Sequence, residues 1–210
     1  MIKNVIFDVD GTLFDTAESI ADAYEQTLKD YNFNIYNVRK KIVEGIGTTP
    51  QIFFKNLLPI DDDLAQKMTD HYRALYRDKF LGNAKMYPGI KELLNNLKVN
   101  SYSTYIVTNK RQDCIDGLID IFNLKDLFLG IYGATPTTLK KVETLSKCIE
   151  LNGLNKEETV LVGDSDNDKH AADASGIHFV GVNYGYGFKD QKDFLDRPSD
   201  MMLALSKYVM

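Results

Sequence analysis

Acidic residues in two short clusters are the first feature of this sequence that could do chemistry. Asp8 and Asp10 follow the apolar run Val5-Ile6-Phe7, and residues 164–168 hold three further aspartates after the apolar run 159–162. Carboxylates that are brought together repel one another unless a cation lies between them. Oxygen ligands suit a hard divalent ion, and Mg2+ is the usual one where phosphate is handled. The two clusters therefore predict a site for a hard cation, and Mg2+ is the candidate if the substrate carries phosphate.

These clusters need a scaffold that brings their ends together. The candidate strands are short apolar runs typical of buried parallel strands, at residues 5–7, 104–107, 127–132, 159–162 and 177–182. Helix-patterned segments separate them, which favours βαβ units. Ligands bind at the carboxyl ends of strands in such sheets, where Thr108 and Asn109 also lie. We expect an α/β, Rossmann-like three-layer core with a mainly parallel sheet.

The stretch between the first strand and the others has a different character. Residues 15–86 are helix-patterned and rich in Tyr and Phe, with turn signals at Gly45-Ile46-Gly47 and Leu58-Pro59. We expect an α-helical insertion there. The core is then formed by residues 1–14 and 87–210.

Composition limits the classes of function. The 210 residues are 44% hydrophobic and 26% charged, which is ordinary for a soluble globular protein. The net charge of -5 argues against nucleic-acid binding. Cys114 and Cys148 have the pattern of small buried or half-buried helix thiols, and no window approaches the ~18 apolar residues of a membrane span. We expect a cytoplasmic protein without a membrane or nucleic-acid partner, as a monomer or weak dimer.

The order of the motifs resembles that of a known superfamily. Asp8-Val9-Asp10-Gly11-Thr12 is similar to the first signature of the haloacid dehalogenase-like hydrolases. Thr108 after a strand, Lys141 at a helix start and the segment 163–168 follow in the family's order. The insertion matches the family's helical cap, and the loop 45–50 resembles that of the phosphoglycolate phosphatase-like branch.

The resemblance implies a set of catalytic roles. Asp8 is the expected nucleophile, and Asp10 is the expected general acid and then base. Thr108 is expected to donate its hydroxyl to the phosphoryl group, and Lys141 to offset negative charge. The family often places Pro after this lysine, but this chain has Val, so the adjacent Lys140 is an alternative.

The resemblance also implies the ligands of the Mg2+ ion. Asp8, Asp164 and the backbone carbonyl of Asp10 are expected to hold it. Asp168 is expected either to ligate the ion through water or to orient Lys141. The ion would screen the attacking carboxylate from an anionic substrate.

Four further residues are expected to contact the substrate, a small phosphorylated metabolite. Gly11 and Thr12 follow the first acidic pair, and Asn109 follows Thr108. Gly47 lies in the insertion, in the loop that the resemblance directs toward the active site. We expect the cap to close over the cleft and exclude bulk water.

The predicted function is that of a Mg2+-dependent phosphatase that hydrolyses small phosphomonoesters through an aspartyl-phosphate on Asp8. One alternative is a sugar-phosphate mutase similar to β-phosphoglucomutase, which uses the same motifs but returns the phosphoryl group to a sugar hydroxyl. A second alternative is a non-catalytic binding or regulatory protein that retains the fold. Proteins of that kind usually lose an essential carboxylate, whereas Asp8, Asp10 and Asp164 are all present here.

Overall fold

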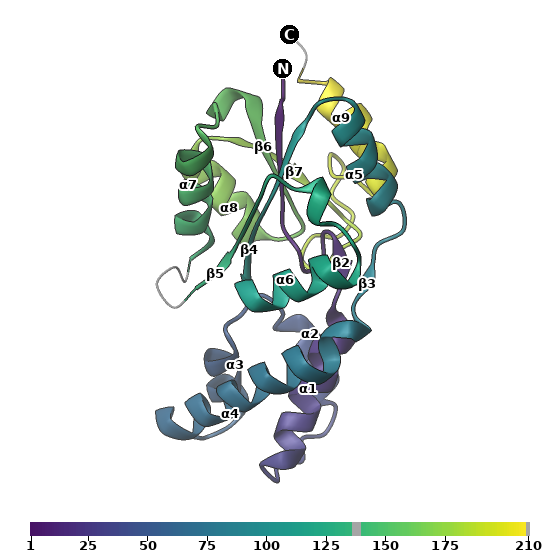
Figure 1. Ribbon diagram of the computed structural model, residues 1–210. Coiled ribbons are helices and arrows are strands. Elements are labelled where there is room, and N and C mark those ends of the chain that lie inside the picture. The colour runs from purple at the N-terminus through teal and green to yellow at the C-terminus, as the bar shows by residue number, and fades with distance from the viewer. Residues whose placement is uncertain (136–139, 209–210) are drawn as a thin grey trace. The chain divides into compact units, whose positions relative to one another are not determined.

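A five-stranded parallel sheet forms the centre of the protein. The computed structural model describes residues 1–135 and 140–208. The strand order is β5-β4-β1-β6-β7, with β1 in the middle (Figure 1). The strands are β1 (Asn4–Phe7), β4 (Ser103–Arg111), β5 (Gly130–Ala134), β6 (Thr159–Gly163) and β7 (His178–Gly181).

Helices cover both faces of this sheet. On one face lie α7 (Lys141–Asn152) and α8 (Asp166–Ser175). The other face carries α5 (Ile90–Val99), α6 (Gln112–Ile121) and α9 (Met201–Ser206). Both faces of each strand are therefore covered, as a parallel sheet requires. The predicted α/β, Rossmann-like class with a helical insertion is confirmed.

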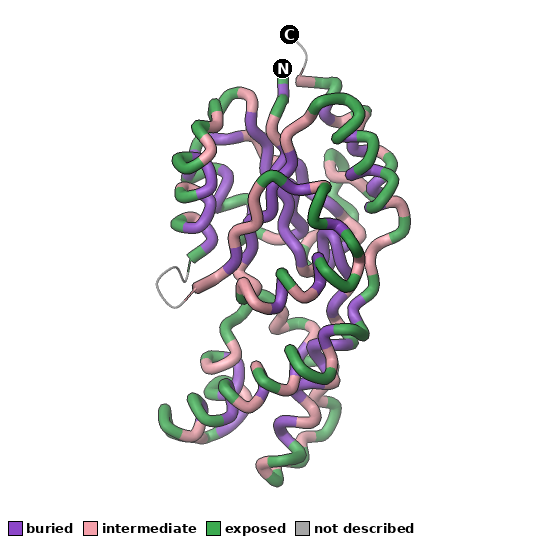
Figure 2. The backbone as a smooth tube through the Cα atoms, viewed as in Figure 1, coloured by how far each residue is buried: buried purple, intermediate pink, exposed green. Residues whose placement is uncertain are grey.

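Burial explains why the strands have apolar runs in place of alternating patterns. Val5, Ile6 and Phe7 of β1 are all buried. Figure 2 shows the buried residues concentrated along the central strands. One continuous apolar cluster joins Ile6 and Leu161 of the sheet to Leu145 and other residues of α7 and α8. Burial of this apolar surface is the main term that stabilises the layers.

The chain divides into two compact units. The first consists of Met1–Asp15 and Lys85–Met210, and the second is Thr16–Ala84. At the passage between them, β2 (Phe14–Asp15) pairs antiparallel with β3 (Lys85–Met86). The residues that leave the first unit are thus hydrogen-bonded to those that return to it.

The second unit is a small helical domain with an aromatic core. Its helices are α1 (Ala17–Asp30), α2 (Val38–Glu44), α3 (Pro50–Leu57) and α4 (Asp62–Leu75), which continues as a π-helical turn at Tyr76–Phe80. The Tyr24 ring stacks on Tyr72 with centroids 4.1 Å apart and contacts the rings of Phe53 and Phe54. These rings are buried, as the helical spacing of the aromatic residues predicts.

Strand boundaries differ most from the expected ones at β4 and β5. The strand β4 runs to Arg111, beyond the predicted end at residue 107. The strand β5 begins at Gly130, three residues later than predicted, because Lys125–Leu127 forms a 3-10 turn. The helix α8 begins at Asp166 because Ser165 caps it, with reciprocal bonds between Ser165 and Asp168.

Two expectations from composition concern the cysteines and membrane-spanning helices. Cys114 and Cys148 are free and buried. Across residues 1–135 and 140–208, no helix combines the length and apolar character that crossing a membrane requires.

The α5 helix offers a matched test of core packing. Leu97 is 0% exposed and Val99 is 82% exposed, two residues apart on the same helix. Leu97→Ala leaves a cavity, so we expect it to lower the free energy of unfolding by about 2–5 kcal/mol. Val99→Ala should change it by less than about 0.5 kcal/mol. Urea unfolding followed by circular dichroism measures both, and equal effects would contradict the assignment of this buried face.

Candidate active site

Strand register brings the acidic segments to one edge of the sheet. Phe7, the last residue of β1, pairs with Ile106 of β4 and with Val162 of β6. The backbone N–H of Asp8 donates to Val162 O at 3.0 Å. Asp8 therefore lies beside the carboxyl end of β6, where Asp164 follows, and beside the segment of β4 that holds Thr108.

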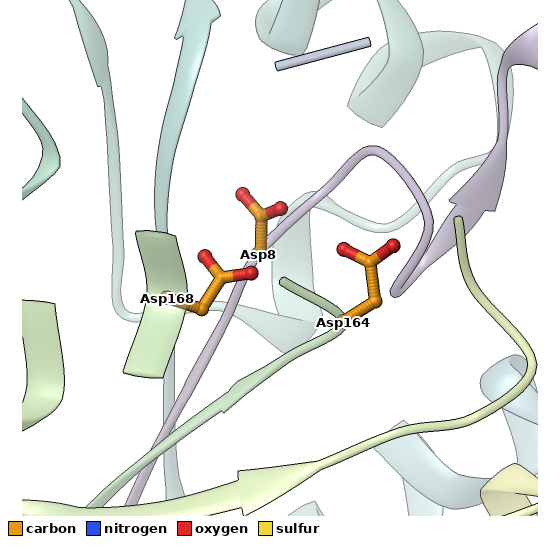
Figure 3. A group of neighbouring side chains, drawn as sticks. All are labelled: Asp8, Asp164 and Asp168. Atoms are coloured by element: carbon orange, nitrogen blue, oxygen red, sulfur yellow. The ribbon is translucent and has the colours of Figure 1, made fainter. Parts of the chain in front are cut away.

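Three aspartates form a compact cluster at this edge (Figure 3). Asp8 follows β1, Asp164 follows β6, and Asp168 lies in the first turn of α8. One carboxylate oxygen of each lies within 4.8 Å of the others, and all three residues are buried. Such a group of buried oxygen donors has the geometry of a site for a hard cation.

Lys141 is the cation that the chain itself supplies to this cluster. Its side chain is 3% exposed, Nζ lies 2.7 Å from Asp8 Oδ1, and it donates a hydrogen bond to Asp168 Oδ1. Burial disfavours the charged lysine, but the two carboxylates outweigh it and hold the pKa of Lys141 above its usual range. The adjacent Lys140 is exposed. The structure thus brings Lys141, and not Lys140, to Asp8.

Asp168 holds Lys141 in place. Its Oδ1 accepts from Lys141, and its Oδ2 accepts from the backbone N–H of Ser165 at 3.0 Å and from Ser165 Oγ at 2.6 Å. Both carboxylate oxygens are therefore engaged with the protein. Of the two expected roles of Asp168, this geometry favours orientation of Lys141.

Asp164 is enclosed by a loop that sequence reasoning missed. Its Oδ2 accepts from the backbone N–H groups of Tyr186 at 2.6 Å and Gly187 at 3.2 Å. A Cβ on Gly11 or Gly185 would lie 2.3 Å from Asp164 side-chain atoms. The alternation of Tyr and Gly in residues 184–187 was the available signal, because glycine permits such close backbone approach.

The electrostatics of the cluster favour an added cation. Burial raises the pKa of Asp8 to about 7, opposed by Lys141 and reinforced by Asp168 and Asp164. Burial likewise raises the pKa of Asp164. With all three carboxylates ionised, one lysine leaves an excess of two negative charges. A divalent cation would balance that excess.

The Oδ1 atom of Asp8 also favours an added cation. Asp8 Oδ1 is buried, and although Lys141 Nζ lies near it, no described residue donates a well-directed hydrogen bond to it. A buried carboxylate oxygen without such a donor is costly unless another group contacts it. The donor set therefore fits a hard divalent ion held by Asp8 and Asp164.

Asp10 is held apart from the cluster. Its carboxylate accepts a hydrogen bond from Lys110 Nζ at 2.8 Å, and it is not among the three carboxylates that converge. Because the backbone carbonyl of Asp10 is the atom expected to ligate the Mg2+ ion, the side chain of Asp10 is not needed as a metal ligand. Lys110 was not predicted from the sequence, since nothing in its spacing from Asp10 relates the two.

Thr108 and Asn109 lie where the neighbouring strand passes the site. Thr108 is buried, and its Oγ accepts from the backbone N–H of Lys110 at 3.2 Å. Because that bond uses an oxygen lone pair, the hydroxyl proton remains able to be donated. Asn109 is half-buried at the next position of β4.

The other predicted substrate contacts have different surroundings. Gly11 turns with φ of 80° against Asp164, which places its backbone in the site. Thr12 is fully buried, and its backbone oxygen accepts from Tyr184 at 3.2 Å. Gly47 belongs to the second unit, between α2 and α3, so its role stays a prediction.

Comparison with known proteins places these residues in a wider context. A family profile described as haloacid dehalogenase-like hydrolase matches residues 5–182. A phosphoglycolate phosphatase of Aquifex aeolicus is 30% identical over 221 aligned positions, which cover 100% of this chain and 99% of the relative. A 5'-nucleotidase of Pseudomonas aeruginosa is 27% identical, with 90% of this chain and 86% of the relative covered.

A solved structure has the same fold over nearly the whole chain. It is a haloacid dehalogenase-like family hydrolase from Streptococcus pneumoniae, with a TM-score of 0.88 and 26% sequence identity. The match covers 97% of this chain and 98% of the other. The resemblance inferred from the motifs is therefore confirmed.

The adjacent lysines provide a matched pair for testing the charge cluster. Lys141→Met leaves Asp8 and Asp168 buried without their partner, so we expect a loss of about 3–5 kcal/mol in the free energy of unfolding. Lys140→Met, at an exposed position, should change it by less than about 0.5 kcal/mol. Urea unfolding of both variants provides the comparison. Equal stability of the two would show that Lys141 does not balance the buried carboxylates.

Proposed function

Because this chain belongs to the haloacid dehalogenase-like hydrolases, we propose that it hydrolyses small phosphate monoesters through a phosphoryl group carried on Asp8. The observation that carries the proposal is the buried cluster of Asp8, Asp164, Asp168 and Lys141 at the carboxyl edge of the sheet. Its relatives include enzymes named phosphoglycolate phosphatase and 5'-nucleotidase, and both names denote release of phosphate from a small ester.

The first step transfers the phosphoryl group to the protein. A carboxylate oxygen of Asp8 attacks phosphorus while the bond from phosphorus to the ester oxygen breaks. Asp10, two residues along the same loop, gives its proton to the departing oxygen. Burial of Asp8 keeps bulk water from the nucleophile, and Lys141 beside it offsets the charge of the approaching phosphate.

The second step releases phosphate. Asp10, now ionised, takes a proton from a water molecule, whose oxygen attacks phosphorus and displaces Asp8. Thr108 donates its hydroxyl to a phosphoryl oxygen through both steps. The two steps restore Asp8 as a carboxylate and Asp10 as an acid, so the cycle closes without another reactant.

A divalent cation is part of the proposal. Asp8 and Asp164, with the backbone carbonyl of Asp10, are the residues that would hold it, and we propose Mg2+. Bound there, it would supply positive charge that lets an anionic nucleophile meet an anionic substrate. Asp168 is proposed to act on Lys141, whose ammonium it contacts.

The substrate is proposed to be a small phosphorylated metabolite of the class named by the relatives. The helical unit at residues 16–84 is proposed to be the cap of this family, since it is inserted directly after the first strand. In enzymes that close over their substrates, such an element limits substrate size and excludes water.

Phosphate release with and without metal tests the proposal directly. We expect the protein to release phosphate from p-nitrophenyl phosphate, 2-phosphoglycolate and nucleoside monophosphates in Mg2+. Excess EDTA should abolish release, and added Mg2+ should restore it, because Asp8 and Asp164 need a cation to be ionised together. Full activity after exhaustive chelation would remove the cation from the mechanism. Conversion of a sugar phosphate to its isomer without phosphate release would favour a mutase.

Replacement of the nucleophile tests the covalent step. Asp8→Asn keeps the shape of the side chain but removes the attacking carboxylate, so turnover should fall to the assay background. Circular dichroism should show that the fold is retained. Asp173→Asn is a matched control, because Asp173 pairs with Lys169 on the surface of α8 and should leave the rate unchanged. A rate of about a tenth of normal in Asp8→Asn would contradict the covalent route.

A further inference from the structure

The pairing of β4 with β5 is irregular at the segment that holds Thr108. Val107 pairs with Tyr132 of β5 and Arg111 pairs with Ala134, so three residues of β4 lie opposite the single Gly133. Such a bulge redirects the side chains within it, and bulges are frequent beside active sites. Residues 108–110 are therefore released from the alternation that a regular strand would impose.

The bulge is supported by close packing. A Cβ on Gly133 would lie 2.8 Å from the backbone oxygen of Lys110 and 2.5 Å from Ile115. The N–H of Gly133 donates to the side-chain oxygen of Gln112 at 2.7 Å. The irregular segment thus has its own partners, which fix the direction in which Lys110 leaves the strand.

Lys110 extends from this bulge to Asp10. Its side chain is only 6% exposed, and Nζ lies 2.8 Å from Asp10 Oδ1. An ammonium group at this depth is costly unless it is paired. The pair joins residues a hundred positions apart, from the loop after β1 and from the end of β4.

Stability alone is a weak reason for such a pair. Apolar side chains of similar volume often stabilise a protein as well as a buried ion pair does. The pair does, however, fix the carboxylate of Asp10. Of the two carboxylates in the loop after β1, Asp10 is the one that lies outside the acidic cluster of Asp8, Asp164 and Asp168. We therefore look to the function of Asp10 to explain why its ion pair with Lys110 is present.

We propose that Lys110 is a positioning residue for the acid step, a role that rests on the proposed phosphatase function. Lys110 holds the Asp10 carboxyl toward the leaving oxygen and stabilises the carboxylate that remains. In that step the proton passes from Asp10 to the ester oxygen as its bond to phosphorus breaks and the bond to Asp8 forms. Lys110 contributes charge and direction, and exchanges no atom.

This role predicts a dependence on the leaving group. p-Nitrophenolate departs with little help from an acid, whereas an alkoxide needs the proton of Asp10. Loss of Lys110 should therefore slow the cleavage of alkyl phosphates more than that of p-nitrophenyl phosphate. A merely structural role would slow both equally, because the same fraction of folded enzyme acts on both esters.

The experiment compares kcat/KM for the best alkyl phosphate of the panel with kcat/KM for p-nitrophenyl phosphate, in Mg2+. In Lys110→Met, which keeps the length of the side chain but removes its charge, we expect the alkyl-to-aryl ratio to fall at least about tenfold. Lys110→Arg, which keeps the charge, should hold the ratio within about threefold of normal. Lys3→Met removes an exposed partner of Glu158 and should leave the ratio unchanged.

The outcomes distinguish the proposed role of Lys110 from the proposed phosphatase function on which it rests. Equal losses on the two esters in Lys110→Met would overturn the role of Lys110 and leave the phosphatase proposal standing. An unaltered enzyme that cleaves neither ester would overturn both. Both rates in a ratio are measured on the same preparation, so partial unfolding lowers them equally and leaves the ratio unchanged. If Lys110→Met is not obtained as folded protein, Lys110→Gln replaces it.

Discussion

The burial of Lys141 among carboxylates is the constraint on which the rest of the site depends. Asp8 and Asp168 reach the same ammonium group from different elements, one after β1 and one on α8. Neither carboxylate could stay buried beside the other without it, because repulsion and desolvation act together. The first turns of α7 and α8 must therefore lie side by side at the edge of the sheet. The capping bonds of Ser165 to Asp168 fix the second of these turns.

Close backbone approach gives the site its shape around Asp164. The glycines of two loops, one after β1 and one after β7, leave no room for a Cβ beside this side chain. The second loop donates two N–H groups to a single oxygen of Asp164, which leaves the other oxygen to face the cluster. Tyr186 of the same loop also donates its hydroxyl to Asp15 at 2.9 Å. The loop thus connects Asp164 of the acidic cluster to the segment where the chain leaves the first unit.

What the sequence could predict follows from local physics. Asp8, Asp164 and Thr108 stand directly after apolar runs, so a parallel sheet alone brings them to one edge. The choice between Lys140 and Lys141 depended on which side of the first turn of α7 faces the sheet, and only packing decides that. The predicted start of β5 is too early because Leu127 and Phe128 are apolar, although Leu127 belongs to a 3-10 turn and Phe128 directly follows it. Lys110 and the loop after β7 act through contacts distant in sequence. The spacing of Lys110 gives no signal of its partner, and the Tyr-Gly alternation of residues 184–187 indicates close backbone approach without indicating to which residue.

Contacts distant in sequence give Asp8 and Asp10, the two carboxylates of the loop after β1, different surroundings. Asp8 and Asp10 are chemically identical and two residues apart, yet a nucleophile and a proton donor need different surroundings. Asp8 lies in the buried cluster with Lys141, where the excess negative charge favours a cation. Asp10 lies outside that cluster with its own lysine, which the bulge of β4 aims at it. Asp8 pairs with Lys141 and Asp10 pairs with Lys110, so the two carboxylates do not compete for one ammonium group. In the proposed mechanism the bulge matters as much as the acidic motif, since Lys110, which lies in it, pairs with Asp10 while Lys141 pairs with Asp8.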